Sequence, residues 1–149
     1  MKKTFIAAIV ACTAIVSTPA FSGDIAPVPG AQQYFINLSD GDTVTSPVKV
    51  LFGISGMGVA PAGVEKEGTG HHHLLIDRPA LGKGEDGMEE YDYGLVGSDN
   101  LIHYGGGQTE TTLELPAGEH TLQLVFGDLN HVPFEPTVET SIITITVTE

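Results

Sequence analysis

Short runs in which apolar and polar residues alternate recur along the chain, and the clearest of them covers residues 48–54. Its apolar members occupy every second position, which predicts a strand with one buried face, because successive side chains of a strand point to opposite sides of the sheet. These members are Val48, Val50, Phe52 and Ile54. Similar runs bounded by turn-forming residues predict further strands, and they cover residues 34–38, 71–77, 109–115, 120–126 and 140–147.

The order of these strands predicts the fold class. The strands at 109–115 and 120–126 are expected to form a hairpin, and residues 78–100 are expected to form a long irregular loop. At the start of the second of these strands, His120 shares a face with Leu122, so we expect it to point inward and hydrogen-bond to backbone upstream. With about seven strands, no repeat and no linker, the pattern predicts an all-β, single-domain, immunoglobulin-like Greek-key β-sandwich.

The first 22 residues predict a secretory signal peptide. A basic start and an apolar stretch over residues 4–16 are followed by Ala20 and Ser22, which are small residues at the two positions that a signal peptidase reads. Cleavage after Ser22 would leave a β-sandwich domain of residues 23–149, periplasmic or secreted. The alternative is a lipoprotein cleavage box that ends at Cys12. The apolar stretch is too short to span a membrane.

Composition narrows the classes of partner. Without the signal peptide, 4 of the 6 basic residues remain against 19 acidic ones, a formal charge of −15. Such a chain repels nucleic acid and anionic membrane surfaces. The single cysteine belongs to the signal peptide, so the exported domain is expected to have neither a disulfide nor a thiolate ligand. It also lacks a second apolar run long enough to form a transmembrane segment.

Three consecutive histidines, His71 to His73, lead directly into the apolar run Leu-Leu-Ile. On a strand, His71 and His73 share one face, about 6–7 Å apart, and His72 takes the other. Two imidazoles at this spacing can reach one metal ion, but a third ligand from another strand is needed for a selective site. His103 and His131 stand at predicted strand ends, and His131 is favoured for this role. Imidazole ligands without thiolate favour copper(II) or zinc(II).

Four sequence blocks carry a resemblance to a known family. They read GHHHLLID from residue 70, HYGGGQTE from residue 103, LPAGEHTLQL from residue 115 and GDLNHVP from residue 127. In this order they resemble the bacterial domain-of-unknown-function family 4399. The resemblance implies an exported, single-domain β-sandwich and brings no established activity. The positions that it marks within its motifs are His71, His73, His103, Gln108, Glu110, His120, Asp128 and His131.

These observations favour a small exported β-sandwich protein that binds a divalent transition metal, copper(II) or zinc(II), through strand-end histidines. The expected ligands are His71, His73, His103 and His131. The alternative is an envelope module that binds a ligand or protein partner and uses its histidines structurally. An enzyme is not expected, because no serine nucleophile motif is present and a hydrolytic metal site would need a general base such as Glu110. The acidic residues at 84–92 match no calcium loop and are interpreted as a solvated insertion.

Overall fold

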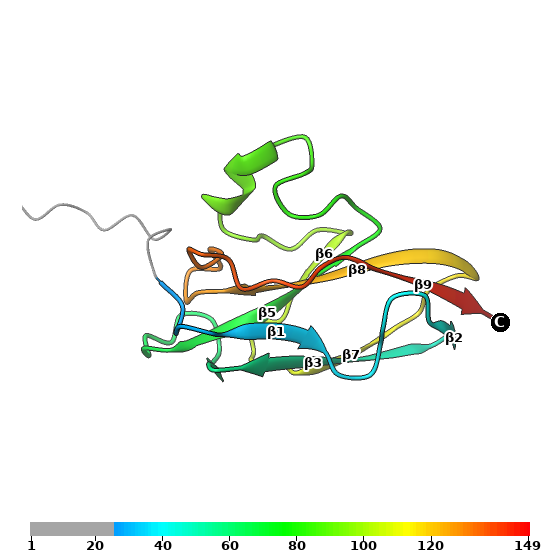
Figure 1. Ribbon diagram of the computed structural model, residues 1–149, viewed down its shortest axis with the longest axis horizontal. Helices are drawn as coiled ribbons and strands as arrows, with labels where there is room; N and C mark the ends of the chain where they lie inside the picture. The colour runs from blue at the N-terminus through cyan, green and yellow to red at the C-terminus, as the bar shows by residue number, and fades with distance from the viewer. Residues whose placement is uncertain (1–25) are drawn as a thin grey trace, which may run out of the picture.

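Nine β-strands and one short 3-10 helix form the regular structure of residues 26–149, the part of the chain that the computed structural model describes (Figure 1). The predicted signal peptide 1–22, with the lipoprotein alternative at Cys12, lies outside these residues. The all-β prediction is confirmed. The elements are β1 (Gln32–Phe35), β2 (Thr43–Thr45), β3 (Val48–Ser55), β4 (Gly58–Val59), β5 (Thr69–Ile76), η2 (Gly87–Tyr91), β6 (Leu101–His103), β7 (Glu110–Leu113), β8 (Gly118–Gly127) and β9 (Ile143–Thr148).

The strands form two sheets that enclose a common core. The small sheet has the order β1-β3-β7, and its neighbours are antiparallel. The larger, curled sheet has the order β2-β9-β8-β5-β4, and β6 also pairs with β5. In its centre, β5 and β8 pair in antiparallel register from His71 opposite Gly127 to Ile76 opposite Leu122. The histidine-bearing strand therefore has paired neighbours on both sides, which fixes its register.

The main apolar core lies between the two sheets. Val48, Val50 and Phe52 of β3 are buried in it, whereas Lys49 between them is exposed, as the alternating pattern predicts. Leu74 of β5 enters the same core from the larger sheet. Full burial of an aliphatic or aromatic side chain contributes about 1.5–3 kcal/mol relative to exposure. This contribution decides which face of β5 turns inward, and the next side chain on either side of Leu74 must then point outward.

Residues 77–100 lie over the outer face of the larger sheet and form a third layer there (green in Figure 1). Leu81 and Leu95 of this segment pack against Leu75 and Val125 of the sheet in a second apolar cluster. The segment predicted as a loop is irregular, but it is anchored by this buried underside. It therefore covers part of the same outer face of the sheet that carries His71 and His73.

The acidic stretch 84–92 keeps the solvated character that its composition predicts. Glu90 is the exception, because its carboxylate accepts the backbone N–H of Gly82 at 2.8 Å and pairs with Arg78. The other carboxylates of the stretch are exposed. They are Glu85, Asp86, Glu89 and Asp92.

The predicted hairpin of residues 109–115 with 120–126 is wrong. The observed β7 pairs with β3 of the small sheet, whereas β8 pairs with β5 and β9 of the larger sheet. Residues 116–119 therefore carry the chain from one sheet to the other. Alternation along a strand identifies its buried face but not its partner strand, so the short connection alone suggested a pairing that the two-sheet packing overrides.

The first strand is displaced from its predicted position. It covers Gln32–Phe35 rather than 34–38, and the buried side chain is Gln33, while Tyr34 and Ile36 are 46% and 57% exposed. The reason is a hydrogen bond within the core, in which Gln33 Nε2 donates to His72 Nδ1 at 2.8 Å. The apolar pattern misplaced this strand because a polar side chain turns inward to partner a buried histidine. The last strand also starts later than predicted, at Ile143.

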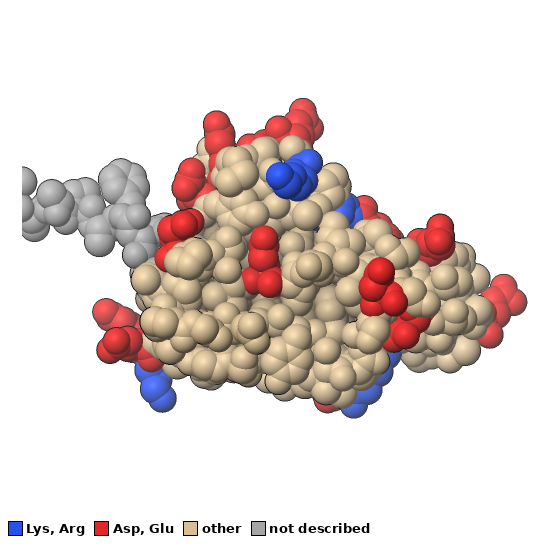
Figure 2. Space-filling model, viewed as in Figure 1, with Lys and Arg blue, Asp and Glu red and all other residues tan. Residues whose placement is uncertain are grey.

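Acidic side chains dominate the charge of the surface. Figure 2 shows them distributed over the visible face, with few basic side chains among them. Within residues 26–149, no helix is long and apolar enough to cross a membrane. The formal charge of the whole chain is −13, which gives the protein a weak general attraction for cations.

Candidate metal centre

The strand β5 presents His71 and His73 on the outer face of the larger sheet. His72, between them, points into the main core, where its ring centroid lies 5.3 Å from that of Phe52 and 5.0 Å from that of Phe126. All three imidazoles are fully buried, at 0% exposure. The alternation is the one that the strand conformation predicts. It separates His72, which serves core packing, from the pair on the outer face.

Two other elements bring His103 and His131 to the same place. His103 ends β6, and its register with β5 puts it directly opposite His73. His131 follows β8, whose last residue, Gly127, stands opposite His71. The centroids of the His103 and His131 rings are 4.4 Å apart. Both rings are half-buried, so the cluster has a buried side on β5 and a partly exposed side on these two residues.

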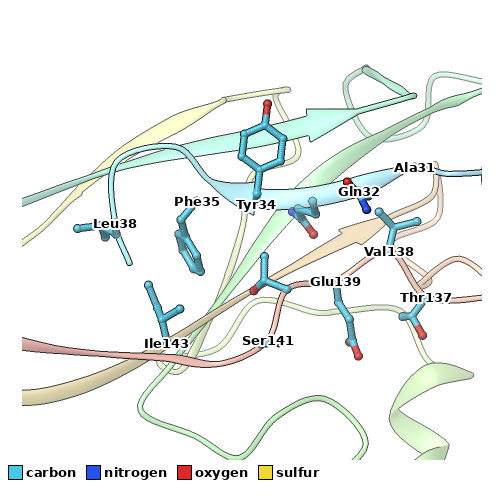
Figure 3. A pocket seen from close by; sticks show the side chains of 12 residues that line it. Ala31, Gln32, Tyr34, Phe35, Leu38, Thr137, Val138, Glu139, Ser141 and Ile143 are labelled. Carbon is cyan, nitrogen blue, oxygen red and sulfur yellow. The ribbon is translucent and has the colours of Figure 1, made fainter. Parts of the chain in front are cut away.

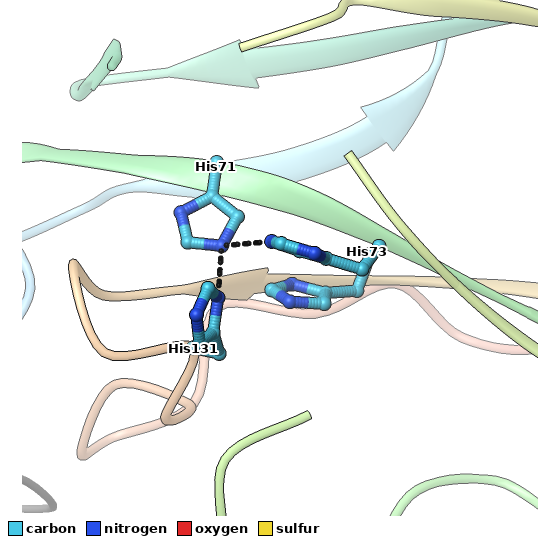
Figure 4. A group of neighbouring side chains, drawn as sticks. His71, His73 and His131 are labelled. Atoms are coloured by element: carbon cyan, nitrogen blue, oxygen red, sulfur yellow. Dashed lines mark hydrogen bonds between the residues drawn. The ribbon is translucent and has the colours of Figure 1, made fainter. Parts of the chain in front are cut away.

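Ring nitrogens of the four histidines converge on one point, and Figure 4 shows how three of the rings face one another. One nitrogen from each ring lies within 4.8 Å of the other three. Nε2 of His71 is 3.0 Å from Nδ1 of His131 and 3.2 Å from Nε2 of His103. An imidazole nitrogen offers a single in-plane site, either a lone pair or a proton. The two hydrogen bonds therefore compete for one site on His71, whereas a central metal ion would use every lone pair.

Two of the separations between these nitrogens fit a four-coordinate ion. Metal–nitrogen bonds of about 2.0–2.1 Å place tetrahedral ligand atoms roughly 3.3–3.4 Å apart. The separations of 3.0 and 3.2 Å at His71 are close to this distance. His73 provides the fourth ring, and neither of its buried nitrogens has a hydrogen-bond partner of ordinary geometry within residues 26–149. Because buried polar atoms nearly always have partners, this ring is suited to a ligand that supplies one.

Burial keeps the rings of His71, His73 and His103 neutral, which metal ligation requires. It is the main reason that the pKa of His71 is lowered to about 4 and the pKa of His73 to about 2. Repulsion by the neighbouring imidazoles lowers both pKa values further, and a backbone contact with Val125 opposes only part of the change at His73. Burial and the nearby His131 ring also lower the pKa of His103. These three rings are ready to ligate at neutral pH without losing a proton first.

Two glycines leave room for the ligand rings. A Cβ on Gly105 would lie 2.3 Å from Cε1 of His103, and a Cβ on Gly127 would lie 2.7 Å from Cε1 of His73. Neither glycine has a φ in the left-handed region, so the close approach of an imidazole is what requires glycine at both positions. Gly127 was not singled out, although a glycine that ends an apolar strand is a signal for close contact.

His120 lies at the other end of β8 and is not part of the cluster. Its Nδ1 is 2.7 Å from Oδ2 of Asp77, and its Nε2 is 2.9 Å from the carbonyl oxygen of Pro116. Both partners accept, so both bonds form fully only when the imidazole is protonated. Burial lowers the pKa of His120, but these two bonds outweigh it and the net shift is upward. The bond to Pro116 is the upstream backbone contact that the sequence predicted.

Two other motif residues lie away from the four histidines. Glu110, named above as the base that a hydrolytic site would need, belongs to β7 of the small sheet and pairs with exposed Lys49 at 3.2 Å. Gln108 accepts the backbone N–H of Gly106 at 3.0 Å and so stabilises the turn after β6.

A groove of about 490 Å³ runs between β1 and the segment that leads into β9 (Figure 3). Tyr34 and Phe35 line one wall, and Glu139 and Ser141 line the other. None of the described residues that line it is a histidine. The groove is therefore separate from the histidine cluster.

Comparisons with known proteins give one match. No curated protein and no solved structure matches the chain. The family model described as "Domain of unknown function (DUF4399)" matches residues 50–148, which include all four clustered histidines and Asp128. The match covers about two thirds of the sequence. The chain belongs to the DUF4399 family.

Proposed function

We propose that this protein binds one divalent transition-metal ion, copper(II) or zinc(II), through four imidazoles. The observation that carries the proposal is the convergence of one nitrogen from each ring within 4.8 Å. The unpartnered nitrogens of His73 and the lowered pKa values of the β5 pair support it, because they describe neutral donors held together out of water. The ligands are His71, His73, His103 and His131.

The donor set supports metal binding rather than catalysis. Structural zinc sites have four protein ligands, whereas catalytic zinc sites have three and keep a position open for water or substrate. Four imidazoles would fill a tetrahedral site. Imidazole suits both copper(II) and zinc(II), whereas copper(I) favours thiolate and thioether donors, which the four-residue cluster does not contain.

We propose that the protein works outside the cytoplasm, in the periplasm or as a secreted protein. The basic start, apolar stretch and small residues of positions 1–22 support export, with residues 23–149 as the mature domain. For this domain we propose an immunoglobulin-like Greek-key arrangement. Its support is the passage of the chain from β7 in the small sheet to β8 in the larger one across residues 116–119.

A second candidate function is an envelope module that contacts a protein partner, with the histidines serving the fold. The observation that favours it is a group of exposed apolar side chains on the segment over the larger sheet. Met88, Tyr93 and Val96 are 68%, 55% and 78% exposed. This candidate needs no metal, so a metal titration separates the two.

The test is calorimetric titration of copper(II) and of zinc(II) into untagged protein 23–149. One ion should bind per chain, and His71→Ala/His73→Ala, which keeps only two of the four ligands, should bind it much more weakly. His120→Gln is the matched control, because it removes an imidazole outside the cluster and should leave the stoichiometry unchanged. Thermal melting of each metal-free variant shows whether it is folded. Absence of stoichiometric binding in the wild type, or equal affinity in a folded double variant, would reject the metal site and leave the interaction module.

A further inference from the structure

One buried carboxylate closes the loop that carries His131. Asp128 is only 1% exposed, and its Oδ1 accepts the backbone N–H of Asn130 at 2.8 Å and that of Val132 at 2.9 Å. These two N–H groups stand on either side of His131 in the chain. We infer that Asp128 is the positioning residue that holds His131 as a metal ligand, an inference that rests on the proposed metal-binding function.

The backbone of the same loop shows why such a hold is needed. His131 has a φ of 70°, in the left-handed region, which is strained for a residue with a Cβ and persists only where the surroundings enforce it. The N–H of His131 donates to the carbonyl of Asp128 at 3.0 Å, and the N–H of Asp128 donates to the carbonyl of Val132 at 2.8 Å. With the two side-chain bonds, four hydrogen bonds close this five-residue loop.

The nitrogen that His131 turns toward the centre makes its backbone position decisive. That atom is Nδ1, which lies 3.0 Å from Nε2 of His71. Nδ1 is closer to the backbone than Nε2, so a ring that ligates through it has a short reach. A small displacement of the loop would take the nitrogen out of bonding range, and rotation of the ring could not restore it. The N–H of Leu95, which donates to the carbonyl of His131 at 2.8 Å, holds the loop from the other side.

Substitutions at position 128 distinguish a role of Asp128 in positioning His131 from an effect of its negative charge. Asparagine keeps a side-chain oxygen that can accept both N–H groups, but it removes the negative charge. Alanine removes the acceptor as well. Serine has one short hydroxyl that cannot reach both N–H groups, and it replaces alanine in the test if Asp128→Ala does not fold. If Asp128 acts by position, asparagine preserves the site and alanine damages it.

The experiment is copper(II) titration with electron paramagnetic resonance of the bound ion. It uses wild type, Asp128→Asn, Asp128→Ala, His131→Ala and the double variant Asp128→Ala/His131→Ala. Wild type and Asp128→Asn should show four coordinating nitrogens and similar affinities. Asp128→Ala should show three nitrogens and an affinity about 10–100-fold lower, the usual effect of removing an outer-shell partner. The double variant should bind like His131→Ala, because a residue that acts only through His131 has no effect once that ring is gone.

Several outcomes would overturn the inference. Four nitrogens and unchanged affinity in a folded Asp128→Ala protein would show that the loop needs no carboxylate. Equal damage by asparagine and alanine would assign the effect to charge. A further loss of affinity in the double variant beyond His131→Ala would show that Asp128 acts elsewhere. These results leave the proposed function intact, whereas a wild type that binds no copper(II) and no zinc(II) removes the proposed function and this inference together.

Discussion

Gly105→Ala should remove His103 from the metal centre at little cost to the fold. Gly105 has an ordinary φ, so alanine fits the backbone there. Alanine at such a position stabilises a protein by about 0.4–1 kcal/mol, because it lowers the conformational entropy of the unfolded chain. The new Cβ would lie 2.3 Å from Cε1 and 2.5 Å from Nε2 of His103. Carbon atoms in contact need about 3.5–4.0 Å, so the ring must move by more than an ångström. The half-buried ring has solvent on one side to move into.

The displaced atom is the one that faces the cluster, because Nε2 of His103 lies 3.2 Å from Nε2 of His71. Disturbing the support of one ligand typically lowers metal affinity by about 10–100-fold, which is about 1.4–2.8 kcal/mol. Urea unfolding of the metal-free protein should therefore change by less than about 1 kcal/mol, while calorimetric titration shows this loss of affinity. Gly106→Ala is the control, since its Cβ would meet only the amide end of Gln108, at 3.1 Å. A folded Gly105→Ala protein with wild-type affinity would refute the role of His103 as a ligand.

Four further outcomes are expected. The unfolding free energy of the metal-free protein should fall as the pH drops from about 6.5 toward 4. Burial lowers the pKa of His71 and His72 to about 4, so over this range the unfolded chain binds protons that the folded protein does not. A urea-denaturation free energy that stays constant over this range would contradict it. Asp77→Asn should lower the unfolding free energy, and this loss should depend on pH with the opposite sign. The loss should be complete below about pH 6.5 and should vanish as the pH rises through the raised pKa of His120, and a difference that grows with pH would refute it. Leu124→Ala, at 0% exposure in the main core, should cost about 2–5 kcal/mol in the same assay, and a cost under about 1 kcal/mol would show that the site is not packed as described. Mass spectrometry of the exported protein should show removal of the first 22 residues, and a diacylated Cys12 would establish the lipoprotein alternative instead.

Much of the site could be predicted because strand periodicity is a local property. The alternation around β5 placed His71 and His73 on one face and His72 on the other, and this depends only on the two-residue period of a strand. The position of His120 could be predicted for the same reason. In contrast, pairing between strands depends on the whole packing arrangement. The supposed hairpin across residues 116–119 failed because a short connection can join two sheets as well as two neighbours in one sheet.

The features that hold the ligands in place could not be derived from sequence patterns. Whether His103 or His131 would supply the further ligand depended on the register of β6 and on a loop conformation, and the structure brings both together. The pattern of apolar residues did not predict that Gln33 is buried, because the burial of this side chain depends on a single hydrogen bond to His72. The steric role of Gly127 follows from a ring that β5 places beside it, 54 residues earlier in the chain. Such contacts exist only in three dimensions.

We propose that the four imidazoles of the cluster bind one metal ion. X-ray absorption spectroscopy at the metal edge, on untagged protein loaded with one equivalent of zinc(II), tests it most directly. Four imidazole nitrogens should lie at about 2.0–2.1 Å from the zinc, and two of them should be lost in His71→Ala/His73→Ala. A coordination sphere of water and carboxylate oxygens, or one that is unchanged in the double variant, would contradict it.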